Sequence, residues 1–415
     1  MKNWPRGVLL GFSALVLGAV LLVPLGVKGL DQDGFYSQLR LFTDVMGKVR
    51  KNYVEEVNSG KLLRGALFGL TDGLDPFSGY LDGEQLSAYR EAQARQRAGV
   101  GMQIAKRGLD YAYIVAVRES GPAWSAGARS GMMLRAIDGI STFDLPLFEI
   151  QKRLSGPADS SVELTLQEPE ERDPKTVTVH RDLWRGPQVQ VEQPQEGAVV
   201  VRLLSIEAGA ADELAAALGA LPLGDQTALL LDLRDLESSN LEEATRIADL
   251  FLRDGTVALI AARGGEGEEL RADVDQIASE SVRRIAVLVN QGTAGASEAI
   301  AAALKNLGGA QLLGSATFGK RSLQSLVPLE QGAALLISTG RFRAAGDSPE
   351  VLESRHRVES DEETEDVESP EDIEPIQLRL QPDHEIPLES ASAEAYVAQR
   401  SAALEKLLAA APSAS

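Results

Sequence analysis

The fold of this chain is decided by the stretch VNQGTAGASE at residues 289–298, which is followed by TFGKRSLQ at residues 317–324. The first stretch connects an apolar run, residues 285–289, to a helical pattern near residues 296–307. The same alternation precedes it, with apolar runs at residues 198–201, 228–231 and 257–260 and helical patterns near residues 207–220 and 240–252. Strands that alternate with helices predict an α/β layer with a largely parallel sheet.

The two quoted motifs resemble those of a known family. Carboxyl-terminal processing peptidases, also called tail-specific proteases, have the motif N-x-x-S-A-S-A-S-E followed by T-F-G-K-G-x-x-Q. The resemblance extends over about residues 35 to 388. It implies a mixed α/β fold in which a PDZ domain, residues 99–182, is inserted before a ClpP/crotonase-like catalytic core, residues 183–390.

The resemblance also implies three catalytic positions. In the family, the middle serine is the nucleophile, and the lysine that serves as general base lies 25 residues later. Lys320 stands at the lysine position, and 25 residues before it stands Gly295. Gln324 would orient Lys320 by hydrogen bonding. The general base is therefore present, while the nucleophile position has no side chain.

Serine–lysine catalysis needs a hydroxyl, a neutral lysine and donors for the oxyanion. Gly295 supplies no hydroxyl, and loss of the nucleophile alone costs about 10⁶ in turnover in a serine protease. Two neighbouring hydroxyls, Ser297 and Thr293, are the alternative nucleophiles. If Ser297 lies in the first helical turn, it is rotated by about 200° from position 295. We expect an impaired peptidase, and the alternative is an active endopeptidase that uses Ser297 or Thr293 with Lys320 as base.

A second departure from the family lies in the predicted oxyanion loop. The family has a strand that ends L-D-L-R-x-N-P-G-G, and its glycines help to form the oxyanion hole. This chain keeps Leu231-Asp232-Leu233-Arg234 but has Glu237-Ser238-Ser239 in place of P-G-G. A carboxylate near a developing oxyanion would repel it, and Ser238 and Ser239 lack the conformational freedom of glycine. In addition, Arg321 replaces a glycine of the family beside Lys320, where it could depress the lysine pKa or crowd the loop.

Residues 99–182 resemble a PDZ domain. The predicted carboxylate-binding loop contains Gly99, Val100, Gly101, Met102 and Ile104, because glycines let successive backbone N–H groups point into one concavity. Further matches are GPAWSAG at residues 121–127 and IDG at residues 137–139, and residues 147–154 would form the helix beside the peptide. The implied ligands are the carboxyl-terminal ends of exported or membrane proteins, bound as an added β-strand.

The amino-terminal part divides into a predicted anchor or signal segment, residues 1–30, and a helical segment, residues 31–98. Gly7–Val27 is an uncharged, mostly apolar run that is long enough to span a bilayer. Lys2 and Arg6 precede it and predict a cytoplasmic amino end, hence a single-pass cell-membrane protein with an extracytoplasmic, periplasmic bulk. A cleaved signal peptide is the competing interpretation. In the helical segment, the turn LDPFSGYL resembles a family turn in which Phe77 is histidine.

Composition excludes several functions. The net charge of −20 argues against a nucleic-acid partner, and the lack of cysteine excludes disulfides and thiol chemistry. No metal or cofactor signature is evident, since His180, His356 and His384 are scattered. Residues 347–374 form a predicted acidic insert, and residues 391–415 a terminal helix and tail. The predicted role is that of a scaffold or regulator, and a homo- or hetero-oligomer with family members is a further hypothesis.

Overall fold

The chain forms two compact units, Met1–Leu67 and Phe68–Ser415, in a computed structural model. The predicted span at residues 7–27 and most of the predicted acidic insert lie outside the residues that the structure describes. The described residues are 32–93, 98–106, 110–143, 145–169, 171–183, 186–262, 267–273, 282, 284–348, 378–389 and 392–409.

In the first unit the structure describes residues 32–67, and these are largely helical, as the sequence predicted. Its main element is α2 (Gln32–Asn52). Arg50 and Lys51 lie in the last turn of this helix, where positive charge interacts favourably with the helix dipole. The next helix, α3 (Ser59–Asp72), begins in this unit. In the described part of the chain, no helix is long and apolar enough to cross a membrane.

The second unit is built around a six-stranded sheet with the order β19–β16–β14–β10–β9–β8. Five of the strands run parallel: β9 (Ala198–Leu203), β10 (Ala228–Asp232), β14 (Arg284–Val289), β16 (Gln311–Gly314) and β19 (His384–Glu385). The sixth, β8 (Val189–Gln195), is antiparallel to β9. All residues of β9 and β10 are buried, as expected for parallel strands that are covered on both faces.

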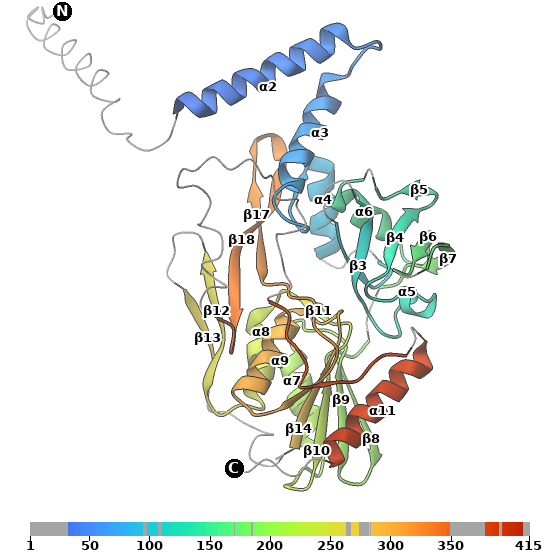
Figure 1. Ribbon diagram of the computed structural model, residues 1–415, viewed down its shortest axis with the longest axis vertical. Helices are drawn as coiled ribbons and strands as arrows, with labels where there is room; N and C mark the ends of the chain where they lie inside the picture. The colour runs from blue at the N-terminus through green and yellow to red at the C-terminus, as the bar shows by residue number, and fades with distance from the viewer. Residues whose placement is uncertain are drawn as a thin grey trace, which may run out of the picture. The chain divides into compact units, whose positions relative to one another are not determined.

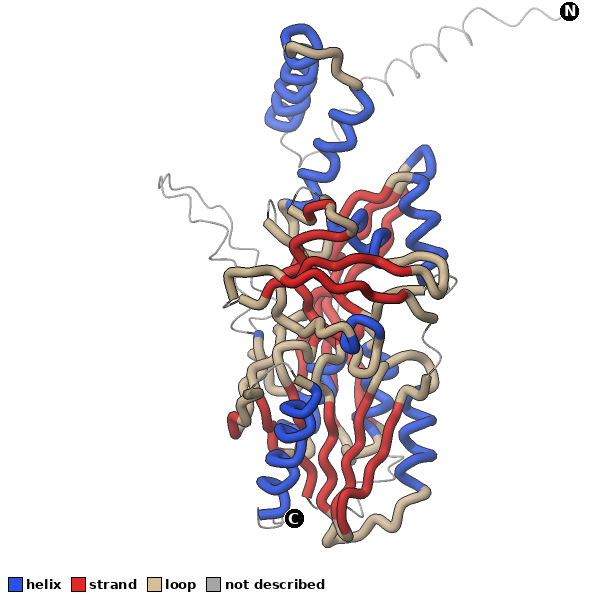
Figure 2. Tube along the Cα trace, turned by 90° about the vertical axis from the view of Figure 1, so that its right-hand side faces the viewer, coloured by secondary structure: helices blue, strands red, loops and turns tan. Residues whose placement is uncertain are grey.

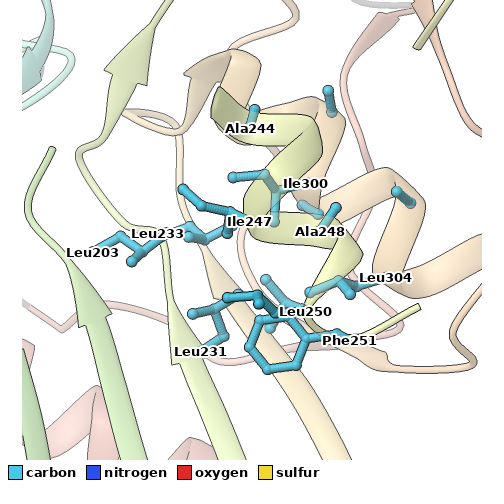
Figure 3. Packing of buried hydrophobic residues seen from close by; sticks show 14 of the residues in the cluster. Leu203, Leu231, Leu233, Ala244, Ile247, Ala248, Leu250, Phe251, Ile300 and Leu304 are labelled. Carbon is cyan, nitrogen blue, oxygen red and sulfur yellow. The ribbon is translucent and has the colours of Figure 1, made fainter. Parts of the chain in front are cut away.

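Helices cover both faces of this sheet (Figure 1). One face packs against α7 (Ala210–Gly219), α8 (Leu241–Asp249) and α9 (Ala296–Asn306). Ile247 of α8 and Ile300 of α9 meet Leu231 and Leu233 in this core, which Figure 3 shows from close by. The opposite face packs against Ala403, Leu404 and Leu407 of α11 (Ala393–Ala409). The predicted α/β layer is therefore confirmed.

A second, antiparallel sheet lies against the same helical core. It has the order β1–β18–β12–β13, with β17 (Ser322–Pro328) also paired to β18, and Val257 and Phe342 join the α8–α9 core. The predicted strand at residues 257–260 belongs here, as part of β12, and not to the parallel sheet. The burial of β12 agrees with this position. Its residues are only partly buried, whereas the strands of a parallel sheet are buried throughout. The other strands are β1 (Gly79–Leu81), β12 (Gly255–Ala262), β13 (Glu268–Ala272) and β18 (Ala334–Ala344).

The PDZ domain is a sheet with the order β2–β3–β4–β6–β7, and a short strand β5 pairs with β4. Strand β2 is at the edge, and helix α6 matches the predicted residues 147–154. The apolar core includes Ile114, Leu134 and Leu164. Its elements are β2 (Met102–Ala105), β3 (Ala112–Val117), α5 (Pro122–Ser125), β4 (Met133–Ile137), β5 (Ile140–Ser141), α6 (Leu147–Leu154), β6 (Ser161–Gln167) and β7 (Lys175–His180).

Helix α11 joins the PDZ domain to the catalytic core. Its Tyr396 ring meets the Trp124 ring of α5 edge-on at 4.5 Å, and the Arg129 guanidinium lies over the Trp124 ring. From the core, Arg234 donates to the Tyr396 carbonyl oxygen at 3.0 Å. The Ser130 hydroxyl also donates to Asp235 at 2.6 Å. Figure 2 shows α11 alongside the strands of the core. These buried contacts position the PDZ domain beside the loop that follows β10.

Candidate active site and tail-binding groove

The predicted nucleophile motif forms a strand–turn–helix unit. Strand β14 ends at Val289, the turn follows, and β15 (Ala294–Gly295) leads directly into α9. The Asn290 side-chain oxygen accepts hydrogen bonds from the backbone N–H groups of Gly292, at 2.9 Å, and Asp235, at 3.0 Å. The turn is thereby tied to the loop after β10, which contains the predicted oxyanion residues.

Gly295 lies at the start of α9 with φ 68 and ψ −123. This positive φ is costly for any residue with a side chain, by about 1–2 kcal/mol. Moreover, a Cβ atom at position 295 would lie only 2.2 Å from the Ser238 carbonyl oxygen. The same atom would be 4.0 Å from Cδ of Lys320, so the structure does bring the nucleophile and base positions together. The space for a nucleophile is filled by the backbone of residue 238.

The predicted oxyanion loop closes over position 295 as a strand. Strand β11 (Glu237–Ser238) pairs in parallel with β15, with Ser238 opposite Gly295. The Ser238 hydroxyl donates to the Ile206 carbonyl oxygen at 3.3 Å and accepts from the Asn240 N–H at 3.1 Å. Ser239 leads into Asn240, whose side chain caps α8 by accepting from the Glu243 N–H. Ser238 and Ser239 thus serve local structure in this arrangement.

Lys320 is bound by a carboxylate. Its ammonium lies 2.6 Å from Oε1 of Glu237, and both side chains are only 8% exposed. The centroid of the Phe77 ring lies 4.7 Å from the same nitrogen, which is a cation–π contact. The nitrogen of Lys320 is therefore engaged by a carboxylate and an aromatic ring, and not by a hydroxyl. Glu237, expected from the sequence to disturb the oxyanion hole, acts here as the counterion of the base position.

Arg321 has other partners than Lys320. Its buried guanidinium lies 3.1 Å from Oε2 of Glu298 and 3.0 Å from Oδ2 of Asp347, whereas Lys320 pairs with Glu237. Glu298 also accepts from Gly295 N–H at 3.0 Å. Burial raises the pKa of Glu298, and the charge of Arg321 opposes this shift. Sequence reasoning missed this network. Its one sequence signal is the arginine that replaces a glycine of the family.

An aromatic cluster is in contact with Lys320 through the Phe77 ring. The Phe318 ring contacts the rings of Phe77 and of Tyr113 from PDZ strand β3, each at 6.2 Å. The Gln324 amide donates to the Phe77 carbonyl oxygen. Gln324 therefore holds the turn that carries Phe77, and the hydrogen bond of its amide goes to this carbonyl and not to Lys320. The signal for this cluster was in the sequence, since Phe77 stands where the family has histidine.

Both alternative nucleophiles are fully buried, at 0% exposure. The Thr293 hydroxyl donates to the Leu233 carbonyl oxygen at 2.9 Å and accepts from the Asn290 N–H at 3.1 Å. The Ser297 hydroxyl donates to the Leu236 carbonyl oxygen at 2.6 Å. Each hydroxyl proton is thus directed at a backbone carbonyl of the loop that precedes or enters β11.

The predicted carboxylate loop lies at the start of β2. Gly101 has φ 78, and the N–H groups of Val100 and Gly101 have no acceptor among the described residues. Gly99, the residue before Val100, forms an antiparallel backbone pair with Asp182. Val100 and Ile104 point into the PDZ core, at 2% and 4% exposure. Two free N–H groups beside an open strand edge suit a peptide carboxylate.

The carboxylate loop opens into a groove with a volume of about 1240 Å³. Strand β2 and helix α6 form the PDZ side, and the core side is formed by residues 204–208 and 235–240. The groove thus reaches β11, while Gly295 and Lys320 do not line it. Strand β11 therefore lies between this groove and the predicted catalytic positions 295 and 320.

Comparisons with known proteins agree with this architecture. Residues 198–363 match the model of peptidase family S41, and residues 113–168 match a PDZ domain. A carboxyl-terminal-processing protease of Picosynechococcus is 32% identical over 282 residues, which cover 67% of each chain. A carboxy-terminal-processing protease of Bartonella bacilliformis is 28% identical over 344 residues, covering 81% of this chain and 78% of the relative.

A solved structure shows the same fold. The photosystem II D1 C-terminal processing protease aligns with a TM-score of 0.62 and 23% identity, over 86% of this chain and 95% of that chain. The sequence relatives, the family match and the fold agree with one another. This chain is therefore a member of peptidase family S41, related to the carboxyl-terminal-processing proteases and equipped with a PDZ domain.

Proposed function

We propose that this chain binds the carboxyl-terminal tails of other proteins and does not cleave them. One observation carries the proposal: the Ser238 carbonyl oxygen occupies the place of a side chain at position 295. The Lys320–Glu237 ion pair supports it, since the nitrogen at the predicted base position is engaged by a carboxylate. Its related proteins are named proteases, so this chain would retain their recognition surface without their chemistry. A scaffold or a regulator of active family members would have these properties.

The alternative is an active endopeptidase that uses Ser297 or Thr293. For either hydroxyl to react, it must leave its carbonyl acceptor and approach Lys320 within about 3 Å. Lys320 must also leave Glu237. Both hydroxyls are buried behind the loop that forms β11, so the rearrangement would dismantle this loop. The geometry therefore favours the binding function.

We expect the full chain to show no peptidase activity on an unstructured protein with an apolar carboxyl terminus. The matched control is Lys320→Ala, and an active family member is the positive control. Equal background for the parent and Lys320→Ala, with no fluorophosphonate adduct, supports the proposal. Cleavage by the parent that disappears in Lys320→Ala contradicts it, and mapping the adduct to Ser297 or Thr293 would identify the nucleophile.

We further propose that residues 1–30 anchor the chain in the cell membrane, with its bulk outside the cytoplasm. Gly7–Val27 supports the anchor, and Lys2 with Arg6 support the orientation. The full chain should stay with the membrane fraction after an alkaline wash, and a chain that lacks residues 1–30 should not. If the protein is found in the periplasmic fraction with a new amino terminus near residue 30, then the segment is a cleaved signal peptide.

A further inference from the structure

The tail-binding groove has a wall that does not belong to the PDZ domain. Helix α4 (Gly83–Gln93), which precedes the domain, contributes Ala88 and Tyr89 to the lining. Phe148 and Gln151 of α6 line the same groove. The groove beside β2 therefore continues onto α4.

Helix α4 is fixed against α6. The rings of Tyr89 and Phe148 lie 6.4 Å apart, and Phe148 is only 6% exposed. Glu84 of α4 forms an ion pair with Lys152 of α6 at 2.5 Å. Phe148 also belongs to an apolar cluster with residues of β1, α4 and β18, namely Leu81, Leu86, Ala88, Ala334 and Leu336. The α4 wall is thus preformed, which limits the entropy lost when a ligand binds.

The position of this wall along a bound tail follows from the direction of α6. The carboxyl end of α6 lies beside the carboxylate loop, because Gly156, which follows the helix, is paired with Ala98. Phe148, at the amino end of α6, consequently lies at the far end of the groove. A tail whose carboxylate meets Val100 and Gly101 runs antiparallel to β2 and reaches Phe148 with its upstream residues.

The length of α6 sets the register. Eight helical residues extend about 12 Å at about 1.5 Å each. An extended chain covers that length in about four residues, at about 3.3 Å each. Side chains alternate between the two faces of a strand, so the fifth residue from the end points to the same side as the last one.

We propose that Tyr89, with Ala88 and Phe148, forms a second side-chain subsite that selects tails with an aromatic or large aliphatic residue at the fifth position from the carboxyl terminus. The proposal rests on tail binding by the PDZ groove. The subsite is aromatic, and Lys152, which lines the same groove, is paired with Glu84. An apolar side chain is therefore the ligand that suits it.

The test is the binding of labelled ten-residue peptides to the full chain, followed by fluorescence anisotropy. The peptides are polar, end in valine and carry phenylalanine or serine at the fifth position from the end. We expect the phenylalanine peptide to bind about tenfold more tightly. Tyr89→Ala should reduce this preference to less than about twofold. Tyr111→Ala is the matched control, because Tyr111 packs against Phe143 outside the groove.

The possible results distinguish failure of the α4 subsite from failure of carboxylate recognition by the PDZ loop. Equal affinity for the two peptides, or a preference that survives in Tyr89→Ala, overturns the α4 subsite alone, provided that carboxyl-terminal amidation still abolishes binding. If amidated and free peptides bind equally, or if neither peptide binds, then carboxylate recognition by the PDZ loop fails, and the subsite falls with it. A preference for phenylalanine at the third position instead of the fifth would contradict the register derived from α6.

Discussion

Replacing Gly295 by serine is expected to leave the protein inactive and to destabilise it by about 3–5 kcal/mol. The positive φ contributes about 1–2 kcal/mol of this cost. The rest comes from a backbone conflict, because the new Cβ would lie 2.2 Å from the Ser238 carbonyl oxygen. Relief of that conflict requires β11 to separate from β15. The measurement is the free energy of unfolding in urea, together with peptidase activity.

Two alanine variants separate the two causes of the destabilisation, which are the positive φ and the conflict with the Ser238 carbonyl oxygen. Gly295→Ala has the same Cβ without a hydroxyl and should be destabilised almost as much as the serine variant. Gly127→Ala is the control for backbone strain alone, since Gly127 has φ 94 and a Cβ there would have no neighbour within 4 Å. It should lose only about 1–2 kcal/mol. Equal losses at positions 127 and 295 would show that β11 moves aside freely, and peptidase activity in Gly295→Ser would show that the oxyanion loop is functional.

Replacing Arg321 by methionine is expected to cost about 3–5 kcal/mol, the usual penalty for a buried charge that loses its partner. The guanidinium is buried between Glu298 and Asp347, and it also donates to the Leu378 carbonyl oxygen at 3.0 Å. Arg343→Met, on a partly exposed residue of β18, is the control and should change stability by no more than about 0.5 kcal/mol. Adding Glu298→Gln to Arg321→Met should recover part of the loss, because the neutral amide needs no cation.

The loss in Arg321→Met should depend on pH. Burial already raises the pKa of Glu298, and Arg321 is the group that opposes this shift. Without Arg321 the folded-state pKa rises further above the unfolded value of about 4.3. A raised carboxyl pKa means that the folded state binds more protons, so stability falls as the pH rises from the unfolded pKa to the folded pKa. The deficit of the variant should therefore be larger at pH 8 than at pH 5. A deficit independent of pH would mean that Glu298 is not the group left unpaired.

Much of the fold could be predicted from local patterns. The apolar runs that became β9, β10 and β14 are buried on both faces, so nearly every residue carries the signal. Strand β12 was assigned to the wrong sheet because its apolar run resembles a parallel strand in composition. Of its two antiparallel partners, β13 follows directly in the chain, but β18 lies far along it, and local sequence does not encode pairing with a distant strand.

The sequence predicted which positions form the candidate site, but not which residues contact them. The 25-residue spacing placed Lys320 next to Gly295, and the structure brings the two together. The partner of Lys320 was not predictable, because Glu237 lies 83 residues earlier in the chain. The same holds for Tyr113 and Phe77, which reach the site from the PDZ domain and from the turn before it.

The sequence by itself determined that this chain has the core of a carboxyl-terminal processing peptidase and a PDZ domain, and it predicted that the nucleophile position has no side chain. Periodicity and short motifs carry that information, since each depends on residues that are neighbours in the chain. The tertiary structure decided that β11 lies where a side chain at position 295 would be, that Glu237 pairs with Lys320, and that α4 extends the groove. These are contacts between distant segments, and their geometry depends on how the sheets, helices and domains pack together.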